Sequence, residues 1–146
     1  MLARAAVAGM TVVGALALMA TPAHAAGDVQ LLKAQYDSPG KDDRSNTSLN
    51  AEFIVLKNSG TSSVSLEGWT LHDVTGYRYD FLDIRIGAGQ KLRVHTGRGT
   101  DTGHDVYWNR GAYVWNNTGD KATLVKPSGA VKDTCKWGDG DGVVSC

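Results

Sequence analysis

From residue 29 onward, short apolar runs alternate with polar, glycine-containing segments. The clearest run, 52–57, is rich in β-branched and aromatic residues and leads into an Asn-Ser-Gly turn at 58–60. Leu92 and Val94 share one face of a later run, because side chains on a strand alternate between its two sides. The runs that favour strands are 29–36, 52–57, 69–74, 77–81, 83–86, 90–96, 106–108, 112–115, 121–126 and 130–137.

This pattern predicts an all-β fold of about eight or nine strands, a density typical of a β-sandwich. Of the eighteen glycines in the chain, fifteen lie after residue 29, where they separate the apolar runs, and no amphipathic helix is predicted after residue 26. Segment 37–48 is expected to be a long polar loop. A length of 146 residues fits one domain.

The first 25 residues have the layout of a secretory signal peptide. Arg4 is their charged residue, 5–20 is apolar, and Ala23-His24-Ala25 is a small-x-small cleavage signal. A membrane anchor is the alternative, but the apolar run is short for a span and the cleavage signal follows it closely. We therefore expect cleavage after Ala25, leaving 26–146 as the domain. We also expect no further membrane span and a location outside the cytoplasm.

The net charge disfavours nucleic acid and anionic membranes as partners, and the two cysteines favour a disulfide. Cleavage would remove Arg4 and no acidic residue, so the net charge would change from zero to −1. No global field then attracts the domain to nucleic acid or to an anionic membrane. The two cysteines, Cys135 and Cys146, predict a disulfide in an exported chain, and free thiols are the alternative. A bridge would contribute roughly 2–3 kcal/mol in the loop-entropy model.

A set of motifs carries a family resemblance through its order and spacing. The motifs are 52–58, Gly68-Trp69-Thr70-Leu71, 79–81, Ile86-Gly87-Ala88-Gly89-Gln90-Lys91-Leu92, Thr96-Gly97, 106–108, 114–117, Gly119-Asp120, 124–125 and 128–129. Together they resemble the lamin tail domain over about residues 29–137, whereas each motif alone is unspecific. The resemblance implies an immunoglobulin-like β-sandwich.

The resemblance also implies roles for single residues. Trp69 is expected in the core, near Phe53 and Phe81. Independently of the resemblance, Trp69 and Trp115 are expected to be buried because large aromatic side chains usually fill a core and its edges. The family has no catalytic residues to transfer. The chain has no heptad rod and no nuclear localisation signal, so it looks like the bacterial, secreted version of the domain, which resembles an adhesion or interaction module. The nuclear partners of lamins are not carried over.

Acidic residues suggest two candidate calcium sites, since calcium takes oxygen ligands from flexible loops. They are the loop with Asp37, Asp42 and Asp43 and the segment with Asp139 and Asp141. Neither has the spacing of an EF-hand, and solvated loops are the alternative. The histidines are scattered and favour no zinc site. No serine-nucleophile motif appears, so hydrolase activity is disfavoured.

Tyr107, Trp108 and Tyr113 surround the turn 109–111, which could display aromatic rings to a sugar. Burial of these rings at the edge of the core is the alternative. We therefore expect a secreted, monomeric, non-catalytic domain that needs no cofactor and binds an extracellular protein or cell-surface glycan. A carbohydrate-binding module is the second hypothesis, and a secreted hydrolase the third. The partner itself is not predicted.

Overall fold

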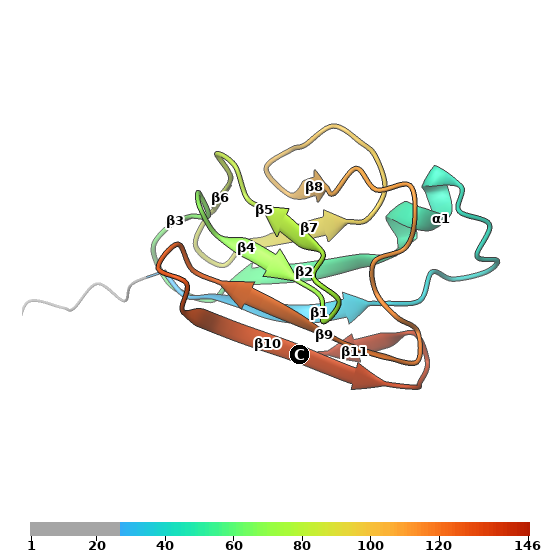
Figure 1. The fold of residues 1–146 in the computed structure, drawn as a ribbon. Helices are drawn as coiled ribbons and strands as arrows, with labels where there is room; N and C mark the ends of the chain where they lie inside the picture. The colour runs from blue at the N-terminus through green and yellow to red at the C-terminus, as the bar shows by residue number, and fades with distance from the viewer. Residues whose placement is uncertain (1–26) are drawn as a thin grey trace, which may run out of the picture.

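A computed structural model describes residues 27–146 of the chain, so the expected signal peptide, 1–25, lies outside the described residues. Figure 1 shows strands throughout the domain and one short helix. In chain order the elements are β1 (Val29–Gln35), α1 (Asn46–Ala51), β2 (Phe53–Asn58), β3 (Val64–Ser65), β4 (Thr70–His72), β5 (Arg78–Asp80), β6 (Arg85–Ile86), β7 (Lys91–His95), β8 (Asp105–Tyr107), β9 (Gly119–Val125), β10 (Val131–Gly138) and β11 (Val143–Ser145).

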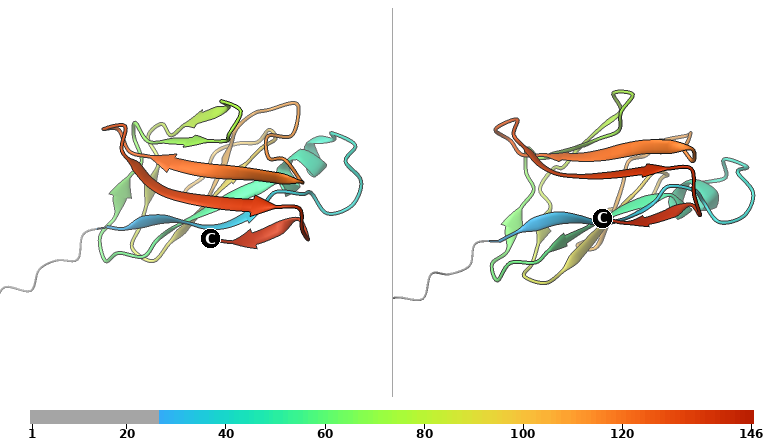
Figure 2. Two further views of the ribbon diagram at one scale, coloured as in Figure 1. Left: turned by 60° about the horizontal axis from the view of Figure 1, so that its bottom comes forward. Right: turned by 90° about the horizontal axis from the view of Figure 1, so that it is seen from below.

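The strands form an immunoglobulin-like β-sandwich. A five-stranded sheet has the order β11-β1-β2-β7-β8, and a four-stranded sheet has the order β10-β9-β4-β5. Figure 2 shows the two layers, with β9 and β10 facing β1 and β2. The strand pairs are antiparallel except for β7 and β8, which are parallel. A small third sheet, β3-β6, lies at one end. The predicted fold class is therefore confirmed.

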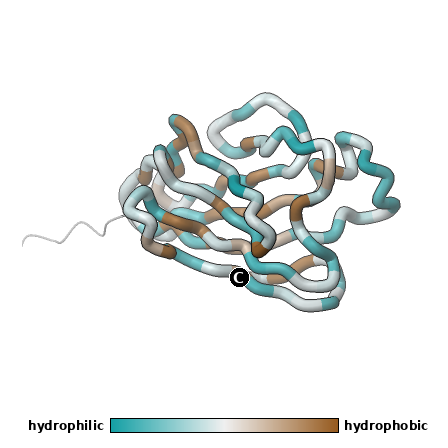
Figure 3. The backbone as a smooth tube through the Cα atoms, viewed as in Figure 1, coloured by the Kyte–Doolittle hydropathy of each residue, from teal (hydrophilic) through white to brown (hydrophobic). Residues whose placement is uncertain are grey.

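The core lies between the two sheets, and it follows from the two-residue period of the strands. On β2, Ile54 and Leu56 are fully buried, and on β9 Ala122 and Leu124 are fully buried. On β9, the more exposed residues Lys121 and Thr123 alternate with them, whereas on β2 Val55, between Ile54 and Leu56, faces the outer side and is also buried. The tube in Figure 3 shows brown, hydrophobic segments on the central strands and teal, hydrophilic segments on the outer loops. Burial of these apolar side chains is the main stabilising contribution to the fold.

The predicted disulfide between Cys135 and Cys146 is confirmed. Cys135 lies on β10, at the edge of the four-stranded sheet, whereas Cys146 directly follows β11, at the edge of the five-stranded sheet. The Cα atoms of the two cysteines are 5.3 Å apart. The bond therefore joins the two layers of the sandwich along one side.

Residues 27–146 form eleven strands, more than the eight or nine expected, because several have only two or three residues. Segment 112–115, expected to be a strand, is irregular. The end of the expected polar loop forms α1, in which the Ser45 hydroxyl accepts a hydrogen bond from the Ser48 backbone N–H at 3.2 Å. Leu49 is the buried residue of this helix. One apolar residue in a single turn and a half leaves no periodic signal.

The four residues expected in the core have different environments. Phe81 and Trp115 are buried. Trp69 is partly buried and packs against the core cluster. Phe53 requires a correction, because it is only partly buried and lies on the outer side of the five-stranded sheet. It begins β2, and the next residue, Ile54, points into the core, so alternation turns Phe53 outward.

Within residues 27–146, no helix has the length and apolar character needed to cross a membrane.

Candidate functional site

The outer side of the five-stranded sheet carries a group of cations that we call the basic face: Lys33, Lys57, Lys91 and Arg93. Lys33 of β1 pairs with Val55 of β2, which pairs with Arg93 of β7, and Lys57 of β2 pairs with Lys91 of β7. Directly paired residues point to the same side of a sheet. Since the residues between them on β2 and β7 are buried in the core, these cations point away from it.

Apolar groups lie beneath these cations. The guanidinium carbon of Arg93 is 4.8 Å from the centre of the Phe53 ring, and the Lys33 ammonium is 5.9 Å from it. Both are cation–π distances. Val55, in the next row, is 8% exposed. Long cationic side chains can cover apolar surface with their stems while the charges stay in water. The basic face therefore consists of cationic side chains that lie over an apolar surface formed by Phe53 and Val55.

Asp105 of β8 is the acidic residue in the row of Arg93. Its Oδ1 atom lies 3.6 Å from Arg93 Nη1 and 2.9 Å from His95 Nε2. His95 Nδ1 is 2.7 Å from the backbone oxygen of Asn50, which can only accept a hydrogen bond. Both ring nitrogens of His95 therefore face hydrogen-bond acceptors. Asp105 is thus engaged by Arg93 and His95, whereas none of Lys33, Lys57 and Lys91 forms an ion pair within residues 27–146.

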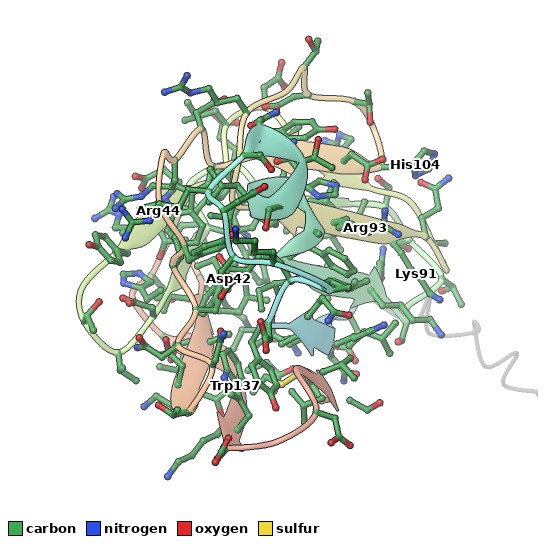
Figure 4. The ribbon with its side chains drawn as sticks, turned by 90° about the vertical axis from the view of Figure 1, so that its right-hand side faces the viewer. Asp42, Arg44, Lys91, Arg93, His104 and Trp137 are labelled. Atoms are coloured by element: carbon green, nitrogen blue, oxygen red, sulfur yellow. A yellow bond between two sulfur atoms is a disulfide. The ribbon has the colours of Figure 1, made fainter. Side chains whose placement is uncertain are left out.

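A cavity of about 390 Å³ opens at the end of the basic face. Val55, Lys91, Arg93, His104 and Asp105 are among the residues that line it. Figure 4 shows Lys91, Arg93 and His104 on the same side of the molecule. This volume lies in the range of ligand-binding clefts, and its lining suits an acidic group beside an apolar one.

The structure separates the aromatic residues expected around the turn 109–111. Tyr107 is half-buried and stacks on His95, with ring centres 4.9 Å apart. Trp108 packs edge-on against Tyr79 and Trp115, at 5.7 and 5.9 Å. The hydroxyl of Tyr113 lies 2.6 Å from the hydroxyl oxygen of Ser48, in α1. The three rings thus lie in three different environments.

The acidic residues expected to bind calcium are also dispersed. Asp42 and Asp43 are exposed, and Oδ1 of Asp43 accepts a hydrogen bond from the Ser45 backbone N–H at 2.9 Å. Hydrogen bonds from Ser45 lower the pKa of Asp43. Asp37 lies away from this pair, beside the turn that holds Asp139 and Asp141, and its N–H donates to the Gly142 oxygen. In the part of the chain that the structure describes, no three His, Cys, Asp or Glu side chains converge as metal ligands.

Glu52 is a buried ionisable residue that was not predicted as part of a site from the sequence. Its Oε1 atom accepts hydrogen bonds from the Thr96 hydroxyl and the Val114 N–H, at 2.5 and 2.9 Å. Its Oε2 atom is buried and has no hydrogen-bond partner among residues 27–146. Burial raises the pKa of Glu52 to about 7, against the opposing effect of these hydrogen bonds.

The basic face was not predicted from the sequence, although one signal for it was present. Lys91 and Arg93 alternate with the apolar residues Leu92 and Val94, which is the pattern of a strand with one solvated side. What the sequence does not show is that β7 lies beside β2, because 32 residues lie between the end of β2 at Asn58 and the start of β7 at Lys91. The near-zero net charge of the whole chain also conceals a local surplus of cations.

Comparison with known proteins adds one finding. Residues 22–139 match the family described as the Lamin Tail Domain. A comparison with curated proteins found no match.

Proposed function

The chain belongs to the lamin tail domain family, and from this premise we propose that it is a non-catalytic interaction module that binds an acidic extracellular macromolecule through the basic face. The main support for the proposal is that four cations, Lys33, Lys57, Lys91 and Arg93, lie together on one side of the sheet over an apolar surface. Charges arranged in this way favour a complementary acidic surface and speed the encounter with it. The partner is an acidic protein or an acidic cell-surface glycan.

Two features support a location outside the cell. The first 25 residues read as a secretory signal peptide, and the disulfide between Cys135 and Cys146 is typical of oxidising compartments. The expected bacterial source and monomeric state belong to the same proposal. A sugar-binding platform receives less support, because Tyr107, Trp108 and Tyr113 lie in separate environments.

The test compares two triple variants of the domain 26–146 in pull-downs with cell-wall preparations and with cell-surface proteins. In one variant, Lys57, Lys91 and Arg93 of the basic face are changed to Gln. In the matched control, three exposed cations of the other sheet and its turn, Lys121, Lys126 and Lys136, are changed to Gln. Each variant removes three positive charges, so the two differ in position and not in net charge.

We expect the basic-face variant to lose binding by about tenfold or more and the control variant to keep it. Binding should also weaken as salt is added, because exposed charges are screened over about 10 Å at 0.1 M salt. Equal binding by the two variants would contradict the proposal. Capture of a glycan rather than a protein by the wild-type domain would decide which partner class is correct.

A further inference from the structure

A second cationic site lies beside α1, in a cleft of about 210 Å³. It is lined by Arg44, Asn46, Leu49, Arg98, Arg110 and Gly111. The three arginines come from three separate segments of the chain, and no carboxylate lines the cleft. In Figure 4, Arg44 lies on one side of α1, whereas Lys91, Arg93 and His104 lie on the other. The arginine cleft is therefore distinct from the basic face.

The backbone of Arg98 is fixed to α1 by side-chain amides. The Arg98 N–H donates to Oδ1 of Asn46 at 2.7 Å. The Arg98 oxygen accepts from Nδ2 of Asn46 and from Nδ2 of Asn50, both at 2.9 Å. The preceding residue, Gly97, lies so close to α1 that an added Cβ would come within 2.5 Å of the Asn50 Oδ1 atom. The position from which the Arg98 side chain projects is thus well defined.

The other two arginines are also held in place. The guanidinium carbon of Arg110 lies 4.0 Å from the centre of the Tyr77 ring, and its N–H donates to the Thr96 oxygen at 2.9 Å. Arg44 has a left-handed backbone with φ of 56°, and its N–H lies 3.4 Å from the Tyr113 hydroxyl. A stacked guanidinium loses less conformational freedom when it binds a ligand than a free one does.

Within residues 27–146, none of these arginines forms an ion pair with a carboxylate, whereas Arg78 and Arg93 do. The acidic residues nearest in sequence are Asp42 and Asp43, which precede Arg44 and do not line the cleft. Three like charges around one small cavity repel one another, and an anion between them would relieve this repulsion.

We propose that the arginine cleft binds one tetrahedral oxyanion, a phosphate or sulfate group carried by an extracellular ligand. Guanidinium groups hold such oxygens with paired, charge-assisted hydrogen bonds. The cavity is smaller than the roughly 300–1,000 Å³ of sites for whole drug-sized ligands, which suits a single group rather than a whole molecule. The inference goes beyond the proposed function, because it uses none of the residues of the basic face.

The test titrates the purified protein with inorganic phosphate and, separately, with inorganic sulfate, at constant ionic strength made up with chloride. Backbone amide NMR shifts report where each anion binds. The variants are Arg98→Gln and Arg110→Gln, and the matched control is Arg85→Gln, an exposed arginine on β6. A thermal melt of each variant verifies folding, and Arg110→Lys supplies a second version that keeps the charge.

We expect saturable binding of at least one anion, with shifts centred on 44–50, 97–99 and 110–111. Each Gln variant should weaken it by about tenfold, Arg110→Lys by less, and Arg85→Gln by less than twofold. Preference for phosphate or for sulfate identifies the ester that the natural ligand carries. The basic-face triple variant should bind the anion like the wild type, so the two proposals can fail separately. Absence of saturable binding, or equal weakening by Arg85→Gln, would overturn the inference.

Discussion

The hydroxyl of Thr96 donates a hydrogen bond of 2.5 Å to Oε1 of Glu52 inside the sandwich. Glu52 is 1% exposed, and its second carboxylate oxygen has no partner in the described chain. An ionised carboxylate in such a place is costly, because water is excluded and only one of its oxygens is satisfied. The pair is therefore a place where the stability of the fold depends on protonation.

Stability should fall as the pH rises through about 7, because burial raises the pKa of Glu52 from 4.5 to about 7. The folded protein then holds a proton that the unfolded chain releases near pH 4.5, so the contribution is fully present below that pH and is lost as pH rises through 7. Its size is on the order of 3 kcal/mol. Urea denaturation between pH 4 and 9 measures it.

Glu52→Gln should abolish this dependence while keeping an acceptor for Thr96 and Val114. The other glutamate of the chain, Glu67, is exposed, so Glu67→Gln is a matched control that should keep the wild-type pH profile. If the wild type and Glu52→Gln lose stability in parallel above pH 6, Glu52 is not the group responsible.

Removal of the disulfide should destabilise the sandwich without changing its fold. Cys135→Ser combined with Cys146→Ser is expected to lower the free energy of unfolding by roughly 2–3 kcal/mol, since the bond restricts the unfolded chain. Denaturation with and without reductant gives the value. Reductant should destabilise the wild type by a similar amount and leave the double variant unchanged. A reductant effect of equal size on both proteins would mean that it acts elsewhere.

The burial of Phe81 and the outward position of Phe53 can be compared with the same substitution. Phe81 is 0% exposed, so Phe81→Ala should cost roughly 3–5 kcal/mol of stability. Phe53 lies partly exposed beneath Arg93 and Lys33, so Phe53→Ala should cost roughly 1–2 kcal/mol. Equilibrium unfolding of the two variants provides the comparison. Equal costs would contradict the outer-face position of Phe53.

Much of the fold follows from strand alternation, which is a local property. Ile54 and Leu56, or Ala122 and Leu124, can be assigned to a core because every second residue of a strand faces the same way. Alternation does not say which face an isolated aromatic at a strand end will choose, and Phe53 shows this. Segment 112–115 is irregular because the N–H of Val114 donates to a buried carboxylate instead of a neighbouring strand.

The candidate sites depend on long-range pairing, which the sequence does not contain in readable form. The basic face exists because Lys57 and Lys91 become neighbours when β2 pairs with β7. The arginine cleft exists because Arg44, Arg98 and Arg110 meet beside a helix too short to leave a pattern. Conversely, Tyr107, Trp108 and Tyr113 are close in sequence, but alternation and irregular backbone turn them to different environments.

Asn58 should be among the residues least tolerant of a small chemical change. It is 0% exposed at the end of β2. Its Nδ2 atom donates to the oxygens of Ser62 and Ile86, at 2.7 and 3.0 Å, and its Oδ1 atom accepts from the N–H groups of Asp28 and Gly60, both at 3.0 Å. A single amide therefore joins the start of β1, the turn after β2 and the end of β6.

Asn58→Asp keeps the acceptor but replaces the two donors by a carboxylate oxygen that faces two carbonyl oxygens. We expect a loss of roughly 3 kcal/mol of stability at pH 7, because a buried charge is left unpaired beside acceptors. Protonation restores one donor, so the loss should be smaller at pH 4. Denaturation at both pH values, with Asn109→Asp in an exposed turn as the control, measures the effect. A loss below about 0.5 kcal/mol, similar to that of the control, would mean that the amide of Asn58 does not hold these segments together.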